Sequence, residues 1–137
     1  MSDPEPNPTP SDFVIVMHAA ERILEVLYPA RPTPDMFDAY EERLRRMVKK
    51  LGGRWMCLVD QRAMPVAPEG LTDRIADFNA WALEHGMTRS ARVVQHRLVA
   101  KLQANHILQH SGVKESSLHY SREDAWGWLL AEAKKEG

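Results

Sequence analysis

The residues that best suit binding or catalysis follow a short apolar run, residues 54–60, which ends in an acid. An aspartate at the end of a buried strand can orient a ligand or a catalytic water. In α/β sheets, ligands and partners meet the carboxyl ends of the strands. We therefore predict a ligand or partner edge in the loop after this run and at the start of the next helix. The candidate residues are Asp60, Gln61, Arg62, Met64, Glu69 and Thr72.

The two acids of this edge also have simpler structural interpretations. The carboxylate of Asp60 can accept a hydrogen bond from a loop N–H or from the next helix, as aspartates after a strand commonly do. Glu69 can act as a fixed negative charge that partly mimics a phosphate. A glutamate in the first turn of a helix is, however, also stabilised by the helix dipole. For both residues we favour the structural interpretation.

Two histidines, His106 and His110, lie four residues apart and so share one face of a predicted helix. Such a pair can bind a metal, but Ile107 stands where the helix of a zinc protease has glutamate. His96 and His119 could lie near, although the spacing fixes no third ligand. We therefore expect a polar helix face and no metal.

The sequence lacks the patterns of common catalytic sites. Cys57 is the only cysteine, and it lies inside the apolar run, where burial raises the pKa of a thiol. Gly52 and Gly53 precede a strand and lack the lysine and serine of a phosphate-binding loop. No G-x-S-x-G elbow is present. We expect a protein that is not an enzyme and that binds no cofactor.

Several large apolar side chains and a group of basic ones remain to be placed. The apolar set could line a pocket or an interface. Core packing is the prediction that we favour for each of Trp55, Met64, Trp81, Met87 and Trp126. Because the overall charge is near neutral, we expect a solvated face for Arg89, Arg92, Arg97 and Lys101.

Length and composition indicate one soluble domain. The chain has 137 residues, 44% hydrophobic and 27% charged, which is ordinary for a protein that folds without a metal or a disulfide. The net charge of −1 gives no electrostatic reason to expect nucleic acid or an anionic membrane as a partner. No apolar run is long enough to span a bilayer. The N-terminus does not resemble a signal peptide, so we expect a cytoplasmic protein.

A central strand and a hairpin before it form the predicted scaffold of the edge. Apolar residues on both faces of 54–60 indicate a strand that is covered on both sides. Residues 13–17 and 22–28 predict two further strands, joined by a turn at 18–21. The proline-rich residues 1–11 have almost no apolar side chains, so we expect a flexible tail there.

Helical spacing of apolar residues appears on either side of the central strand. The first helix starts at Thr33, which can cap it, and at Pro34, whose missing N–H costs nothing there. It ends at the glycines 52–53. A second helix starts at Leu71 and is stopped by Gly86.

The last part of the chain alternates short strands with helices. We predict strands at 91–94 and 118–120, with a third helix at 98–109 between them. Ser121 can cap a final helix. The apolar face of this helix should hold Ala125, Trp128 and Leu129, with Ala133 as a further candidate.

The resulting order of elements is β-β-α-β-α-β-α-β-α. This order predicts a single α/β domain over residues 12–137. Its sheet should be mixed and mainly parallel, with about four to five strands and about four covering helices.

Parts of the sequence resemble the SpoIIAA-like branch of the STAS domains, a family of sulfate-transporter and anti-sigma-factor-antagonist domains. The likeness covers roughly residues 12–133. It rests on the hairpin, the strand that ends in Asp60, the pair His85-Gly86 and the closing stretch 122–129, Arg-Glu-Asp-Ala-Trp-Gly-Trp-Leu. The resemblance implies the α/β fold given above and a regulatory role through protein partners.

Relatives of the sporulation antagonist carry a phosphorylatable serine at the start of the helix after the central strand. Here the matching residues 68–72 read Pro-Glu-Gly-Leu-Thr, so the serine is absent and Thr72 is the nearby hydroxyl. We therefore expect a non-catalytic regulatory or interaction module that serine phosphorylation does not switch. Its partner would be another protein or a second copy of the chain. The alternative is a small binding protein that holds an apolar ligand between helices and sheet.

Overall fold

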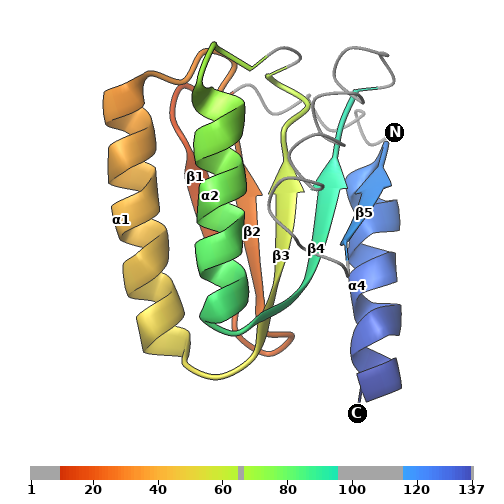
Figure 1. Ribbon diagram of the computed structural model, residues 1–137. Coiled ribbons are helices and arrows are strands. Elements are labelled where there is room, and N and C mark those ends of the chain that lie inside the picture. The colour runs from red at the N-terminus through yellow and green to blue at the C-terminus, as the bar shows by residue number, and fades with distance from the viewer. Residues whose placement is uncertain (1–9, 65–66, 96–115, 137) are drawn as a thin grey trace.

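Five strands form one sheet in the computed structural model, which describes residues 10–64, 67–95 and 116–136 (Figure 1). Their order in space follows the chain: β1 (Val14–His18), β2 (Ile23–Leu27), β3 (Trp55–Asp60), β4 (Met87–Val93) and β5 (Ser116–His119). β1 and β2 pair antiparallel, and every later neighbouring pair is parallel. The sheet is therefore mixed and mainly parallel, as the sequence predicted.

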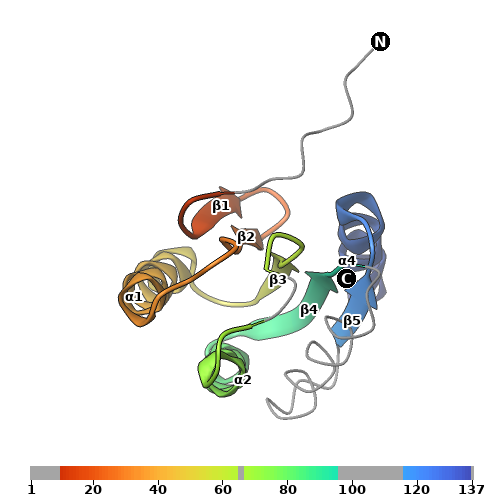
Figure 2. The ribbon, with the colours of Figure 1, turned by 90° about the horizontal axis from the view of Figure 1, so that it is seen from above.

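Helices cover both faces of this sheet. α1 (Pro34–Leu51) and α2 (Leu71–Glu84) lie on one face, and α4 (Arg122–Glu136) covers the β4 and β5 end of the other (Figure 2). The described elements follow the order β-β-α-β-α-β-β-α, a single α/β domain. None of the described helices is long and apolar enough to cross a bilayer. The helix predicted at 98–109 and nearly all of the predicted tail lie outside the described residues.

β3 lies at the centre of the core. Every residue of this strand is buried. Trp55, Cys57 and Val59 pack in the cluster beneath α1 and α2, whereas Met56 and Leu58 pack in the cluster beneath α4. The prediction of a strand covered on both faces is confirmed.

The local sequence signals at both ends of α1 act as predicted. The Thr33 hydroxyl accepts a hydrogen bond from the Met36 N–H at 3.2 Å, and Pro34 opens the first turn. At the other end, Gly52 has a φ of 63°, a conformation that favours glycine. Its N–H donates to the Val48 carbonyl oxygen at 2.9 Å. These caps fix where α1 begins and where the chain turns toward β3.

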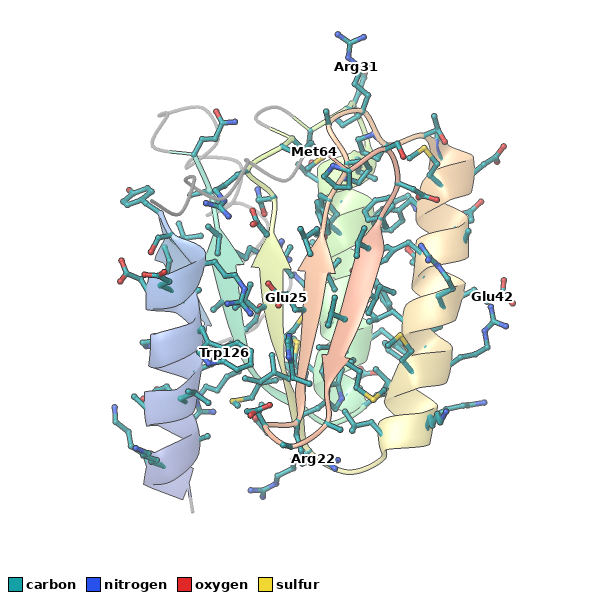
Figure 3. The ribbon with its side chains drawn as sticks, turned by 180° about the vertical axis from the view of Figure 1, so that it is seen from behind. Arg22, Glu25, Arg31, Glu42, Met64 and Trp126 are labelled. Carbon is teal, nitrogen blue, oxygen red and sulfur yellow. The ribbon has the colours of Figure 1, made fainter. Side chains whose placement is uncertain are left out.

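Arg22 connects the β1–β2 turn to the end of α1 (Figure 3). It has a φ of 59°, which is uncommon for a residue other than glycine. Its guanidinium donates hydrogen bonds to the carbonyl oxygens of Leu51, Gly52 and Arg54. The end of a helix leaves such carbonyls without partners. Arg22 therefore fastens the hairpin to the α1–β3 connection.

β4 starts at Met87, earlier than the position 91 predicted from the sequence. The polar residues Thr88 and Arg89 concealed this part of the strand, because the prediction relied on an apolar run. Just before the strand, Gly86 has a φ of 102°, and a Cβ there would collide with the Gly53 carbonyl oxygen. Glycine is thus required where α2 turns into β4.

α4 is capped as predicted but packs less deeply than expected. The Ser121 hydroxyl accepts a hydrogen bond from the third N–H of the helix at 3.1 Å. Ala125 and Leu129 are buried against the sheet, and Trp128 packs against the same cluster but is only half-buried, so the prediction of its full burial was wrong. α4 lies over the β5 edge, where the Trp128 ring packs beside His119 with 5.9 Å between ring centroids. An edge position leaves one side of the indole uncovered.

Candidate functional site at the carboxyl end of the sheet

Asp60 ends β3 with a buried carboxylate that is already paired. One oxygen accepts a hydrogen bond from the Arg62 N–H at 3.1 Å. Both oxygens accept from the Arg62 guanidinium, with a shortest distance of 2.7 Å. This confirms the interpretation of Asp60 as a residue that caps the loop after its strand. Its carboxylate holds the loop in place and has little room to contact a substrate.

The next residues of the predicted edge also point inward. Gln61 is buried, and its side-chain oxygen accepts a hydrogen bond from Arg92 at 3.0 Å. Met64 is buried in the cluster beneath α1 and α2, at the upper end of the sheet in Figure 3. Its N–H donates to the Gln61 carbonyl oxygen at 3.1 Å. The first part of the loop therefore closes the end of the core.

Arg92, which we expected on a solvated face, has an exposure of 0%. The β3–β4 register places its side chain on the sheet face that α1 and α2 cover. Arg89 lies on the opposite face, with its guanidinium 3.6 Å from the Glu132 carboxylate of α4. The prediction of a solvated face was thus wrong for both residues. Arg97 and Lys101 lie outside the described residues.

The interior around Arg92 holds polar groups but no carboxylate at ion-pair distance among the described residues. One terminal nitrogen donates to Gln61, while Nε and the other terminal nitrogen are buried without a hydrogen-bond partner there. Burial raises the pKa of the neighbouring Tyr28, Tyr40 and Cys57, to about 12 for the thiol, and the Arg92 charge opposes each rise. The inert Cys57 agrees with the sequence prediction. A buried, unpaired cation is unusual because desolvation costs several kcal/mol.

The exposed part of the predicted edge lies where α1 and α2 begin. Glu69 is exposed and Thr72 is half-buried. α2 starts at Leu71 after Gly70, so Glu69 precedes the helix and does not occupy its first turn. The predicted position of Glu69 in the first turn of the helix was therefore wrong. Glu69 instead borders a hollow of about 180 Å³ whose other walls include prolines, Leu71 and Arg74.

Arg74 joins α2 to α1 beside this hollow. Its guanidinium lies 2.6 Å from the Asp38 carboxylate and 3.3 Å from that of Glu41. It also lies over the Phe37 ring, 4.6 Å from the centroid. Ion pairs that solvent reaches contribute little to stability. They join the first half of α1 to the first turn of α2 beside the hollow.

The large apolar residues divide between the core and the surface. Core packing is confirmed for Trp55, Met64 and Met87. Trp81 of α2 and Trp126 of α4 are half-buried, on opposite faces of the sheet. In both places an aromatic ring lies beside charged side chains.

A charged cluster that was not expected from the sequence surrounds Glu25, which is buried within the apolar strand β2. Its carboxylate accepts hydrogen bonds from Arg122 at 2.6 and 2.9 Å and lies 2.9 Å from His18 Nε2. Trp126 completes the cluster, with its ring against His18 and below the Arg122 guanidinium (Figure 3). Burial acts to raise the pKa of Glu25, but the hydrogen bonds and charges of Arg122 and His18 outweigh it and lower the pKa. The sequence did contain a signal for this cluster, because Glu25 is an acid between the apolar residues of β2.

The described part of the chain contains no group of three metal-binding side chains. His119 is hydrogen-bonded to the Ser117 hydroxyl on the same strand, and burial lowers the pKa of its ring. The histidines His96, His106 and His110 lie outside the described residues.

We found no protein family model, no curated protein and no solved structure that matches this chain. The function of the chain is therefore inferred from its own structural features. The relevant features are the exposed edge around Glu69, the buried Arg92 and the hollows along α1 and α2.

Proposed function

We propose that this chain is a non-catalytic regulatory or protein-interaction module of STAS-like type, whose partner meets the carboxyl end of the sheet. The observation that carries the proposal is the hollow of about 180 Å³ between the starts of α1 and α2, with the exposed Glu69 at its rim. Prolines and Leu71 give it apolar walls, which suit an apolar side chain from a partner. α/β sheets commonly bind at this end of their strands.

The fold and the chemistry of the edge support this proposal. An antiparallel hairpin followed by parallel strands agrees with the fold expected from the STAS resemblance. At the edge itself, Asp60 is bound to its own loop and Gln61 is bound to Arg92. The described edge therefore has a hollow and the exposed charge of Glu69, but no nucleophile paired to a base among its residues. Such a surface suits recognition better than catalysis.

The residues at the family's phosphorylation position support a surface that does not switch. Pro68 and Glu69 are both exposed there, and neither can be phosphorylated. A phosphoserine carries nearly twice the charge of a glutamate and has more acceptor oxygens, so Glu69 mimics it only in part. The partner therefore meets the same charge at all times.

Glu69→Gln tests the proposal because it removes the charge and keeps the size of the side chain. The variant should retain less partner than the native protein when purified from the cells that produce it. The loss should be larger at low salt, where an exposed charge is least screened. Glu123→Gln is the matched control, because Glu123 is equally an exposed glutamate but lies on α4. Equal partner retention by all three proteins would contradict the proposal.

Arg92 favours a second candidate function, that of a small binding protein. The alternative drawn from the sequence is an apolar ligand between helices and sheet, and Arg92 lies in that layer. Two of its buried nitrogens have no partner among the described residues. A carboxylate or phosphate on the ligand would pair with such a guanidinium. Native mass spectrometry would favour this function if it showed a retained anionic molecule that Arg92→Met loses.

A further inference from the structure

A hollow of about 480 Å³ lies between α1 and α2 near their C-terminal ends, at the other end of these helices from Glu69. The C-terminal ends of both helices lie at the bottom of Figure 1. This volume falls in the range of ligand-binding pockets. The proposed partner edge does not use it, and its chemistry is different. Its main lining residues are Arg45, Arg46, Val48, Lys49, Trp81 and His85.

The aromatic side of this hollow is held in one arrangement. The His85 ring stacks on the Trp81 indole, with centroids 4.2 Å apart and 18° between the planes. His85 Nδ1 lies 2.7 Å from the Trp81 carbonyl oxygen. The buried Phe78 packs against Trp81 at 5.3 Å, and the Arg45 guanidinium lies 5.2 Å from the indole centroid. The half-exposed indole therefore offers an apolar surface that needs little ordering on binding.

The rim of the hollow is basic. Arg45, Arg46 and Lys49 supply three positive charges to the lining and Glu42 supplies one negative charge, while Arg45 also lies 3.7 Å from the Glu41 carboxylate. Arg46 and Glu42 lie 3.8 Å apart and are both largely exposed, so their pairing is weak. Lys49 has no ion-pair partner among the residues that the structure describes. Arg46 and Lys49 are therefore the cations available to an acidic ligand.

The spacing of the cations fits an extended peptide. Arg46 and Lys49 are three residues apart on α1, which places side chains about 5–6 Å from each other. Alternate side chains of an extended peptide are roughly 6.7 Å apart and point to the same side. The side chain between them points to the opposite side. A peptide along the groove can thus direct two acids toward α1 and the residue between them toward Trp81 on α2.

We propose that this hollow binds an extended acidic segment of a partner protein with the pattern acid, apolar, acid. The two carboxylates pair with Arg46 and Lys49 on α1, and the apolar side chain packs on the half-exposed Trp81 ring of α2. The charge is confined to one end of a groove in a near-neutral chain, which favours a short acidic peptide over a nucleic acid. The site is separate from the edge around Glu69 and does not depend on the function proposed for that edge.

Indole N–H signals in NMR spectra of the isotope-labelled full chain test this proposal. The probe is a capped glutamate–phenylalanine–glutamate peptide flanked by glycines. It should shift the Trp81 signal, which Trp81→Phe identifies, and leave the signals of Trp126 and Trp128 on α4 in place. Replacing both glutamates of the probe by glutamine, or its phenylalanine by alanine, should remove most of the shift.

Charge variants of α1 provide the matched comparison. Lys49→Glu should weaken probe binding roughly three- to tenfold, the effect expected from reversing one exposed ion pair. Lys50→Glu makes the same change next to the hollow but outside its lining, and it should keep the native affinity. An unmoved Trp81 signal at millimolar probe, equal shifts with the glutamine probe, or equal weakening by both variants would overturn the proposal. So would an oligothymidylate that moves the Trp81 signal at lower concentration.

Discussion

Two charged residues lie inside this sheet in opposite electrostatic situations. Glu25 lies beside His18 on the face that carries α4, and the Arg122 guanidinium binds it through two hydrogen bonds. Arg92, on the α1–α2 face, has one amide oxygen and no carboxylate at ion-pair distance in the described part of the chain. The first charge is compensated and the second is not. Neutralising them should therefore change stability in opposite directions.

Arg92→Met should raise the free energy of unfolding by about 1–4 kcal/mol, because methionine fills a similar volume without a buried charge. The lost hydrogen bond to Gln61 offsets about 1 kcal/mol of this gain. Urea unfolding of the native and variant proteins measures the difference. Arg92→Lys keeps the charge and should give no gain. A methionine variant less stable than the native protein would contradict this view of Arg92.

Glu25 should make the protein less stable in acid. Burial acts to raise its pKa, but Arg122 and His18 lower it below the ordinary 4.5 in the folded protein. Its stabilisation is therefore complete above the unfolded pKa and is lost as the pH falls through the folded pKa. At neutral pH, Glu25→Gln should cost about 1–3 kcal/mol. Unfolding measured across pH should show this difference shrinking below pH 4.5, and a constant difference would contradict the role of the charge.

At the scale of elements, features that depend on neighbouring residues could be predicted from the sequence. Thr33 and Gly52 delimit α1, and Ser121 caps α4, because a cap needs only a few adjacent residues. The start of β4 could not be predicted, since the half-buried Arg89 pairs with an acid on α4 that is distant in sequence. Trp128 was misplaced for a similar reason. The burial of Trp128 depends on how α4 lies relative to the edge strand β5, and the spacing of apolar residues within α4 does not determine that.

The position of the loop after Asp60, at the carboxyl end of β3, could be predicted, but the directions of its side chains could not. The rule for parallel strands pointed to the loop after Asp60. Arg62 turns back to Asp60, and Gln61 turns to Arg92, and both contacts follow from loop geometry and strand register. Glu25 was missed because the apolar residues around it dominate the pattern of its strand.

α4 should depend more on Leu129 than on Trp128 for its packing. Leu129 is fully buried, so Leu129→Ala should cost about 2–5 kcal/mol. Trp128 is half-buried at the edge, so Trp128→Ala should cost only about 1–2 kcal/mol despite the larger side chain. Denaturant midpoints of the two variants provide the comparison. A larger loss for Trp128→Ala would mean that α4 packs in another orientation.

In the molecule as a whole, the two faces of the sheet present different surfaces. On one face, the groove between α1 and α2 has the Glu69 hollow at one end and the basic hollow around Lys49 at the other. On the other face, the Arg122–Glu25 pair ties α4 to the sheet, and Val14 and Val16 of β1 remain 40% exposed. Arg74 balances the charge of Glu69 in the lining of the first hollow, whereas cations outnumber acids in the lining of the second.

The most direct measurement of the proposed function is photo-crosslinking from Pro68, an exposed residue that lines the hollow beside Glu69. A photoreactive amino acid at this position should join a defined partner protein to the chain in the cells that produce it. The same amino acid at Glu123 on α4 should not. Adding Glu69→Gln to the first variant should reduce the adduct. The absence of any adduct from position 68, or the same adduct from both positions, would contradict a partner edge at the carboxyl end of the sheet.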